Sequence, residues 1–159
     1  MPEIGGIYKV DNLLDLDSCL FMESVGDAKQ GRWITMCLED GQYVMTSGLS
    51  SCTAFAIWDP LNRVASLAHF DGGQTSADVT SMIDEVLELG GDVDNLQFAA
   101  VGSQYNQTLI SVWNCLDPRL SPAPRPPAGG EGPANVFFGN WAFLVCNGWL
   151  GQPDEGLKS

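Results

Sequence analysis

The chain has 159 residues, a length that suits a single domain, and 45% of them are hydrophobic, which is ordinary for a protein with a packed core. Its 20 acidic and 7 basic residues give a net charge of −13, and such a surface repels phosphate backbones, so we expect no nucleic-acid partner. No apolar run is long enough for a membrane span and the first residues lack a secretory-signal pattern, which favours a cytoplasmic protein or one exported without a classical signal peptide.

The first half of the chain contains four segments that predict β-strands. Residues 13–24 come before them and fit either a short helix or a strand. Segments 32–38 and 43–47 are β-branched and apolar and flank the turn sequence "EDGQ", so they predict a β-hairpin. The run 52–59 is almost continuously apolar, as in a strand buried on both faces. An Asp-Pro turn follows it, and the run 64–70 predicts its antiparallel partner.

The segment 75–91 predicts the clearest helix. Thr75 or Ser76 can cap its first turn, and two glycines, Gly90 and Gly91, end it. Its apolar side chains recur at helical spacing and predict one buried face, made of Val79, Met82, Ile83, Val86 and Leu87.

The last third of the chain returns to strand patterns around a break. Strands are predicted at 96–102 and 108–114, and two short strands within 136–150. Between them, residues 117–134 are rich in proline and glycine and predict a loop without regular structure. The pattern as a whole predicts an α+β (mixed α/β) domain with a mostly β core and one strong amphipathic helix.

One cysteine and the only histidine suggest a reactive site. Cys52 lies in the Gly/Ser-rich turn before the strand 52–59, and His69 lies near the end of the partner strand. The start of one antiparallel strand lies beside the end of the next, so we expect the two side chains to be neighbours on one face. An imidazolium beside a thiol lowers the pKa of the thiol and yields a thiolate nucleophile. A buried cysteine beside a buried histidine also occurs in cores without catalysis, so the spacing alone leaves both interpretations open.

Other groups are expected to complete the site. The turn residues Gly48, Ser50 and Ser51 are small, so backbone amides of the turn can point at a developing oxyanion. A loop that follows the strand 96–102 is expected at the rim of the pocket, and its residues are Ser103, Gln104 and Tyr105. With one histidine and no C-x-x-C pair among five cysteines, we expect no metal site and no cofactor.

The stretch "TSGLSSCTAFAIWDPLNRVASLAHF" resembles the signature of the chemoreceptor glutamine deamidases (CheD). That signature has a strand ending in threonine, a Gly-Leu-Gly-Ser-Cys turn, a hydrophobic strand, an Asp-Pro turn and an Ala-His strand end. The positions in register here are Thr46, Gly48, Leu49, Ser51, Cys52, Asp59, Pro60, Ala68 and His69. Ser50 replaces a glycine of the family, and the likeness extends weakly over residues 44–103. Deamidase toxins of the cytotoxic necrotizing factor type share the Cys–His pair and are an equally relevant comparison.

The resemblance implies a fold, an activity and three roles. The fold is a CheD-like deamidase domain over residues 1–159, with a β-sandwich-like core of mixed sheets flanked by helices. Cys52 would be the nucleophile, His69 the base and Thr46 the third member of the triad. The activity would be a cysteine-dependent amidohydrolase that converts a glutamine side chain of a target protein to glutamate through a thioester, as in a toxin or effector-like enzyme.

Two alternatives remain open from the sequence. One is a catalytically inactive CheD-like domain that uses its acidic surface to hold a protein partner. The other is a hydrolase that acts on a free amide at a chain terminus. In each case the expected partner is another protein, and the oligomeric state is open.

Overall fold

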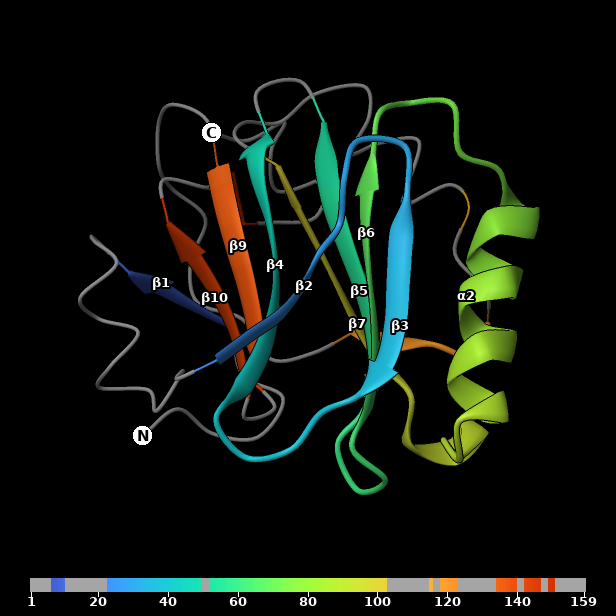
Figure 1. Cartoon of the computed structure of the whole chain (residues 1–159). Helices are drawn as coiled ribbons and strands as arrows, with labels where there is room; N and C mark the ends of the chain where they lie inside the picture. Colours follow the sequence, from blue (N-terminus) through green and yellow to red (C-terminus); the bar gives the residue numbers. More distant parts are fainter. Residues whose placement is uncertain are drawn as a thin grey trace.

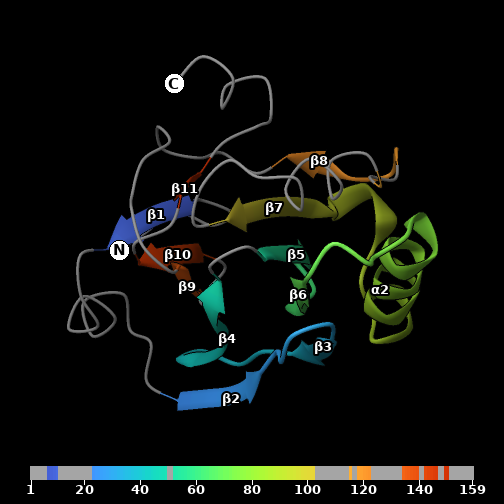
Figure 2. The same cartoon turned by 90° about the horizontal axis from the view of Figure 1, so that it is seen from above.

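The computed structural model of the chain describes residues 7–10, 23–49, 52–102, 115, 118–122, 134–139, 142–146 and 149–150. Two mixed β-sheets lie face to face, and the helix α2 (Ser76–Glu88) covers the outer face of one of them (Figure 1, Figure 2). The α+β class expected from the sequence is therefore seen in the described residues, and within them one α-helix flanks the sheets. None of the described helices is long and apolar enough to cross a membrane.

The first sheet, sheet A, has five strands. Their order across the sheet is β1 (Ile7–Val10), β10 (Ala142–Cys146), β9 (Ala134–Gly139), β4 (Gln42–Leu49) and β2 (Glu23–Asp27). The two outer pairs, β1 with β10 and β2 with β4, are parallel, and the inner pairs are antiparallel.

The second sheet, sheet B, has six strands and carries the helix. Their order is β11 (Trp149–Leu150), β7 (Gln97–Gly102), β5 (Thr53–Asp59), β6 (Val64–Phe70) and β3 (Trp33–Cys37), with β8 (Ser121–Pro122) paired to β7. A short 3₁₀ helix, η1 (Val93–Asn95), joins the end of α2 to β7.

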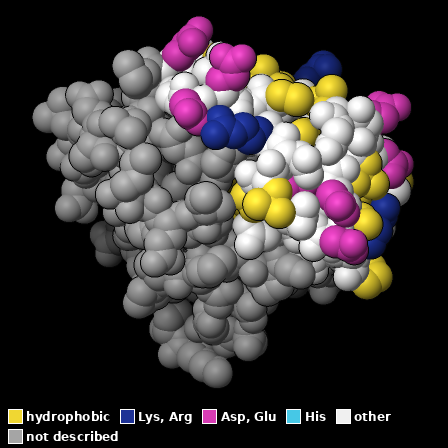
Figure 3. Space-filling view, turned by 90° about the horizontal axis from the view of Figure 1, so that it is seen from below, with side chains coloured by type: hydrophobic (Ala, Val, Ile, Leu, Met, Phe, Trp, Pro, Cys, Tyr) yellow, Lys and Arg dark blue, Asp and Glu magenta, His cyan; other side chains and the backbone are white. Residues whose placement is uncertain are grey.

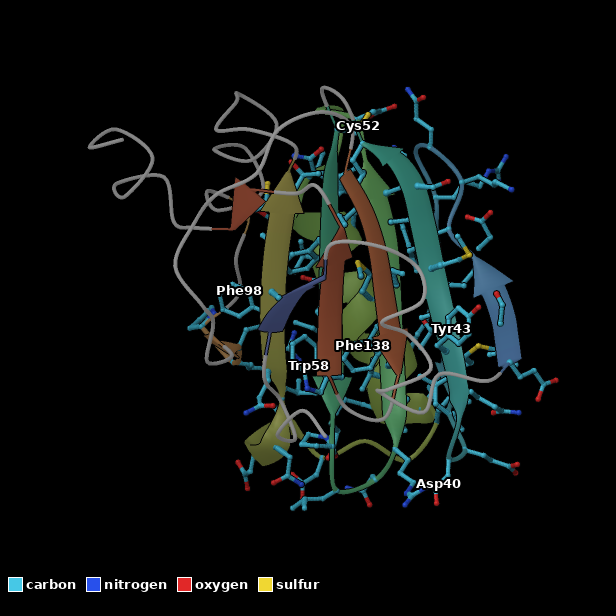
Figure 4. All side chains as sticks on the ribbon, turned by 90° about the vertical axis from the view of Figure 1, so that its left-hand side faces the viewer. Asp40, Tyr43, Cys52, Trp58, Phe98 and Phe138 are labelled. Atoms are coloured by element: carbon cyan, nitrogen blue, oxygen red, sulfur yellow. The ribbon has the colours of Figure 1, made fainter. Side chains whose placement is uncertain are left out.

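Strands β5 and β6 form the centre of the molecule, because every residue of both is buried. Their inner face packs against sheet A, where the rings of Trp58 and Phe138 lie 4.8 Å apart between centroids (Figure 4). Their outer face packs against α2, where Phe55 belongs to the same buried core cluster as Val79 and Met82 of the helix. Burying each such large apolar side chain contributes about 1.5–3 kcal/mol. The near-continuous apolar runs correctly predicted both strands and their antiparallel pairing.

The helix α2 begins and ends where the sequence predicts. The backbone N–H of Thr75 donates to the Asp78 carboxylate at 2.8 Å. This bond gives a partner to a backbone donor at the start of the helix that has no acceptor within the helix. After the helix, Gly90 has a φ of +103°, a conformation that side chains with a Cβ rarely adopt. Four of the five residues predicted for the apolar face are buried, and Leu87 is partly buried.

The predicted hairpin of segments 32–38 and 43–47 is wrong. Strand β3 pairs with β6 in sheet B, whereas β4 pairs with β9 and β2 in sheet A. The turn itself is formed, since the Gln42 N–H donates to the Glu39 carbonyl at 3.1 Å. The turn sequence fixes a chain reversal but not which strands pair after it, and here it carries the chain from one sheet to the other.

Three further expectations need correction. Residues 121–122, predicted as loop, form β8, which pairs in parallel with the start of β7. A proline is tolerated there because an edge strand can leave one backbone donor position unused. Ala134, also assigned to the loop, begins β9, and the segment expected to hold two strands contributes β9, β10 and β11. The predicted strand 108–114 lies outside the described residues.

Candidate active site

Four segments meet at one end of the two sheets, which we call the site end. They are the end of β4, the start of β5, the end of β6 and the connection from β2 to β3 (Figure 1). Cys52 lies at this end, directly before β5 (Figure 4). Its side chain is 7% exposed and belongs to the core cluster between the sheets. The site end therefore brings the predicted nucleophile to the edge of the inter-sheet core.

His69 lies on β6, and Cys52 directly precedes its antiparallel partner β5, which begins one residue later than the strand 52–59 that the sequence predicts. The register places Ala54 opposite His69, so Cys52 is the diagonal neighbour on the same face of β5. Diagonal neighbours are about 7–8 Å apart at Cα, a separation that an aromatic ring can span. His69 is 5% exposed and, like Cys52, faces sheet A, where its ring meets a residue of β4.

That residue is Thr46, whose side chain is fully buried. Its hydroxyl lies 2.8 Å from Nδ1 of His69 and 2.7 Å from the Ala28 carbonyl oxygen. A bulge follows it, because the pairing of β4 with β9 shifts between Thr46 and Leu49. Gly48 lies in this bulge with a φ of +70°, a left-handed conformation that favours glycine. The bulge reverses the alternation of β4, so that Thr46 and Leu49 both point inward.

These two hydrogen bonds determine where the imidazole proton lies. A carbonyl oxygen only accepts, so the single Thr46 hydroxyl proton is donated to Ala28. The hydroxyl oxygen must then accept from Nδ1 of His69, which carries the N–H. The other ring nitrogen, Nε2, is left with its lone pair and is the basic atom of the ring.

Nε2 is buried and has no hydrogen-bond partner in the described part of the chain. No hydrogen bond therefore joins Nε2 to the sulfur of Cys52. Buried polar atoms of native proteins are nearly always paired, so an exception calls for an explanation. A lone pair held in place beside a thiol is the arrangement expected of a general base before substrate binds.

The environment of His69 favours the neutral ring. Burial lowers the pKa of His69 below its ordinary value of 6.5, while the negative charges of Asp71 and Asp27 and the Ala28 carbonyl oppose that shift. With the pKa lowered, the imidazole is neutral at pH 7 and free to accept a proton. The two carboxylates would also stabilise the imidazolium once it forms.

The sequence did not reveal the connection between β2 and β3 as part of the site. Besides the Ala28 carbonyl, the Gly31 N–H donates to the His69 carbonyl at 2.8 Å, and the His69 N–H donates to the Arg32 carbonyl at 2.9 Å. These are backbone contacts, which any residue type can make, so no side-chain pattern signals them. Residues 28–32 thus hold both the backbone of His69 and the hydroxyl that orients its ring.

The remaining predicted site residues divide into two groups. Gly48 is placed in the bulge, next to the turn that leads to Cys52. The others lie outside the described residues, namely Ser50, Ser51, Ser103, Gln104 and Tyr105. Within the described residues, no group of three or more His, Cys, Asp or Glu side chains is arranged to hold a metal ion.

No protein-family model matches the chain, and a search of curated proteins finds no match either. The resemblance to the glutamine deamidases therefore depends on the residues in register between Thr46 and His69. Chemically, the described groups supply a thiol, a neutral imidazole of fixed tautomer and a hydroxyl that orients it. This set suits acyl transfer by a cysteine nucleophile.

Proposed function

We propose that the protein is a cysteine-dependent amidohydrolase that converts a glutamine side chain of a target protein to glutamate. The single observation that carries this proposal is the hydrogen-bonded chain from Ala28 through Thr46 to His69, which leaves Nε2 basic and unpaired. A histidine that only filled the core would gain stability by pairing that nitrogen. Its position on the same face as Cys52 supports a base for the thiol.

The reaction would proceed in two halves. Cys52 Sγ attacks the carboxamide carbon while its proton passes to Nε2 of His69. The C–N bond then breaks, the proton passes from Nε2 to the nitrogen, and ammonia leaves a thioester. In the second half, water gives a proton to Nε2 and attacks the thioester carbon. The C–S bond breaks, the thiolate regains the proton, and glutamate is released. An amine in place of water would give transglutamination as a minor outcome.

The burial of the site favours a slender substrate group. Only 7% of the Cys52 side chain is exposed, so a bulky main-chain amide would have difficulty reaching the sulfur. A glutamine side chain is unbranched and carries its carboxamide at the tip. Ammonia is a small leaving group and needs little space to depart. These features favour side-chain deamidation over cleavage of the main chain.

Thr46 would act as a positioning residue in this scheme. It fixes the tautomer and the plane of the His69 ring without touching the substrate. In this scheme Nε2 and the sulfur come together when substrate binds, as hydrogen bonds of catalytic groups often tighten at that stage.

The test is a search for converted glutamines by mass spectrometry. The protein is incubated with a panel of candidate proteins, and peptides are examined for the exchange of NH₂ by OH on glutamine. We expect conversion by the wild type and a decrease of at least about 10³-fold for Cys52→Ser. The matched control is Cys37→Ser, which changes an exposed thiol on β3, far from the site end.

The outcomes separate the proposal from its main rival. Equal conversion by Cys52→Ser and the wild type would contradict a role for this thiol. No conversion of any panel protein, together with tight binding of one of them, would support the inactive binding domain instead. On the face opposite the site end, acidic side chains lie among hydrophobic and basic ones, so a binding partner would meet a mixed surface there (Figure 3).

A further inference from the structure

A cavity lies directly beside the candidate active site, on the other face of β6. Its volume is about 170 Å³, several times the roughly 30 Å³ that one water occupies in the liquid. The walls include Trp33 and Phe70, and the polar groups are Asp71, Gln74 and Asp78. The cavity opens at the start of α2, which Figure 1 places at the same end as the tip of β6.

The cavity and the site share the same piece of backbone. Phe70 and Asp71 follow His69 directly, and Gly31, which also lines the cavity, donates its N–H to the His69 carbonyl. The side chains of Cys52 and His69 face sheet A, whereas Trp33 on the cavity side bonds to Glu85 of α2. The end of β6 therefore lies between the candidate site and the cavity.

Among the residues that the structure describes, no basic side chain pairs with the charges in the cavity. Among the described residues the ion pairs are Lys29 with Asp27 and Arg63 with Asp40, so neither Asp71 nor Asp78 has a basic partner within salt-bridge distance. Both carboxylates accept hydrogen bonds from backbone N–H groups of the adjacent loop. A cation that enters the cavity would meet two uncompensated carboxylates.

The aromatic and amide groups indicate what kind of cation fits. A guanidinium or ammonium group over the face of an indole ring is attracted by the ring quadrupole, and the half-buried Trp33 supplies this ring, while Phe70 forms a buried wall. The Nε2 of Gln74 is buried without a hydrogen-bond partner, and its N–H groups suit a carbonyl oxygen of a bound peptide. An arginine or lysine residue within a peptide carries both features.

We propose that this cavity is a specificity subsite that receives an arginine or lysine side chain of the protein substrate, close in sequence to the glutamine that Cys52 attacks. This inference rests on the proposed deamidase function. An extended peptide advances about 3.3 Å per residue, so a chain that crosses the end of β6 would place a residue about two to four positions from the glutamine in the cavity. The substrate class is thus a basic segment that contains an accessible glutamine.

The first experiment measures binding without any need for activity. The indole N–H signal of Trp33, assigned with Trp33→Phe, is followed by NMR during titration with N-acetyl-arginine amide or N-acetyl-citrulline amide. Citrulline has the shape of arginine without its charge. We expect a saturable shift with the arginine compound and at least about five-fold weaker binding of the citrulline compound.

Two variants localise the effect. Asp78→Asn removes one cavity charge and should weaken arginine binding by about five-fold or more, whereas Asp84→Asn removes an exposed charge from the same helix and should leave it unchanged. Because Asp78 also caps α2, helix content is checked by circular dichroism. Equal binding of arginine and citrulline, or an unmoved Trp33 signal, would overturn the proposal.

The second experiment measures deamidation of peptides that differ only in carrying arginine or citrulline near the glutamine. We expect kcat/KM to be at least about five-fold higher for the arginine peptide, mainly through a lower KM. Equal rates for both peptides would refute the subsite and leave the deamidase function intact. Selective arginine binding with no deamidation of either peptide would refute the proposed function instead.

Discussion

Two buried polar side chains lie at opposite ends of the same pair of strands and differ in how fully their polar atoms are hydrogen-bonded. Asp59, at the end of β5, accepts hydrogen bonds from four donors, the backbone N–H groups of Leu61, Asn62 and Asp92 and the Asn62 amide. His69, at the end of β6, has one ring nitrogen paired and the other unpaired. The two ends of β5 are roughly 20 Å apart, so the two sites do not influence each other directly.

Under the proposed function, this difference in hydrogen bonding separates a structural group, Asp59, from a functional one, His69. Asp59 ties the β5–β6 turn to the segment after α2, and its hydrogen-bonding capacity serves the fold. At His69 the surroundings fix the ring but leave its basic atom unused. An unpaired buried atom lowers stability, and the proposed reaction would give this one a use. Substitutions at the two ends should therefore affect different properties.

Among the substitutions that compare the two ends, Asp59→Ala is expected to have the largest effect, and it should fall on stability. The substitution leaves four donors without their acceptor, which should cost about 3 kcal/mol of unfolding free energy, or roughly a 100-fold change in the folding equilibrium. Denaturant titration measures this change, and under the proposed function deamidation per folded molecule should stay as in the wild type. The matched control is Asp40→Ala at the same end of the molecule (Figure 4), where an exposed carboxylate is lost and stability should barely change. A stable Asp59→Ala variant with impaired catalysis would reverse the assignment of the two ends.

A smaller effect, on activity, is expected from Thr46→Val. The variant keeps the shape of the side chain but no longer accepts the Nδ1 proton, so the tautomer and the plane of the ring are no longer fixed. We expect kcat to fall by roughly 10- to 100-fold, with KM little changed. Thr46→Ser retains the hydroxyl and should restore most of the rate. Equal kcat values for the valine and serine variants would mean that Thr46 only fills space.

The smallest effect is the dependence of stability on pH. His69 and Asp59 are expected to change the unfolding free energy in two different pH ranges. Burial lowers the pKa of His69 below 6.5. Below about pH 6.5 the unfolded chain therefore binds a proton at His69 more readily than the folded chain does, and the unfolding free energy falls. Burial alone would raise the pKa of Asp59, but hydrogen bonds from Asn62, Asp92 and Leu61 outweigh it and hold the pKa below 3.8. The stability that Asp59 contributes is therefore complete above that value and is lost as the pH falls through the lowered pKa.

Unfolding free energies measured from about pH 7 down to pH 3 should resolve both declines. His69→Gln should remove the decline that begins near pH 6.5, and Asp59→Asn should reduce the one at acid pH. A decline in the upper range that persists unchanged in His69→Gln would show that another group titrates there.

The parts of the molecule predicted well from the sequence are those where burial leaves a local pattern. Strands β5 and β6 are buried on both faces and therefore read as continuous apolar runs, and α2 has a capping residue, a 3.6-residue period and a terminal glycine. The spacing of Cys52 and His69 follows from that hairpin, so the candidate pair could be predicted with it. The sequence could not predict that Cys52 and His69 are diagonal neighbours and not directly opposite, because the exact register of two paired strands leaves no trace in the apolar pattern.

The parts that were missed depend on long-range pairing or on backbone atoms. The turn before β4 is a chain reversal in the sequence, but the choice between one sheet and two is made by partners more than 80 residues later, in β9. Strands β1 and β2 are short edge strands and carry little periodic signal. The carbonyl of Ala28, which sets the state of Thr46 and His69, is a group that every residue carries.

The most direct test of the central claim is the alkylation rate of Cys52 by iodoacetamide at about pH 6, compared between the wild type and His69→Ala. If Nε2 is the base for the thiol, removing the ring takes away the proton acceptor, and labelling of Cys52 should slow by at least about 10-fold while the exposed Cys37 reacts as before. Peptide mapping by mass spectrometry identifies the labelled residue, and circular dichroism verifies the fold. Faster labelling of Cys52 in a folded His69→Ala variant would contradict the account, because it would mean that the imidazole only packs over the thiol and shields it from solvent.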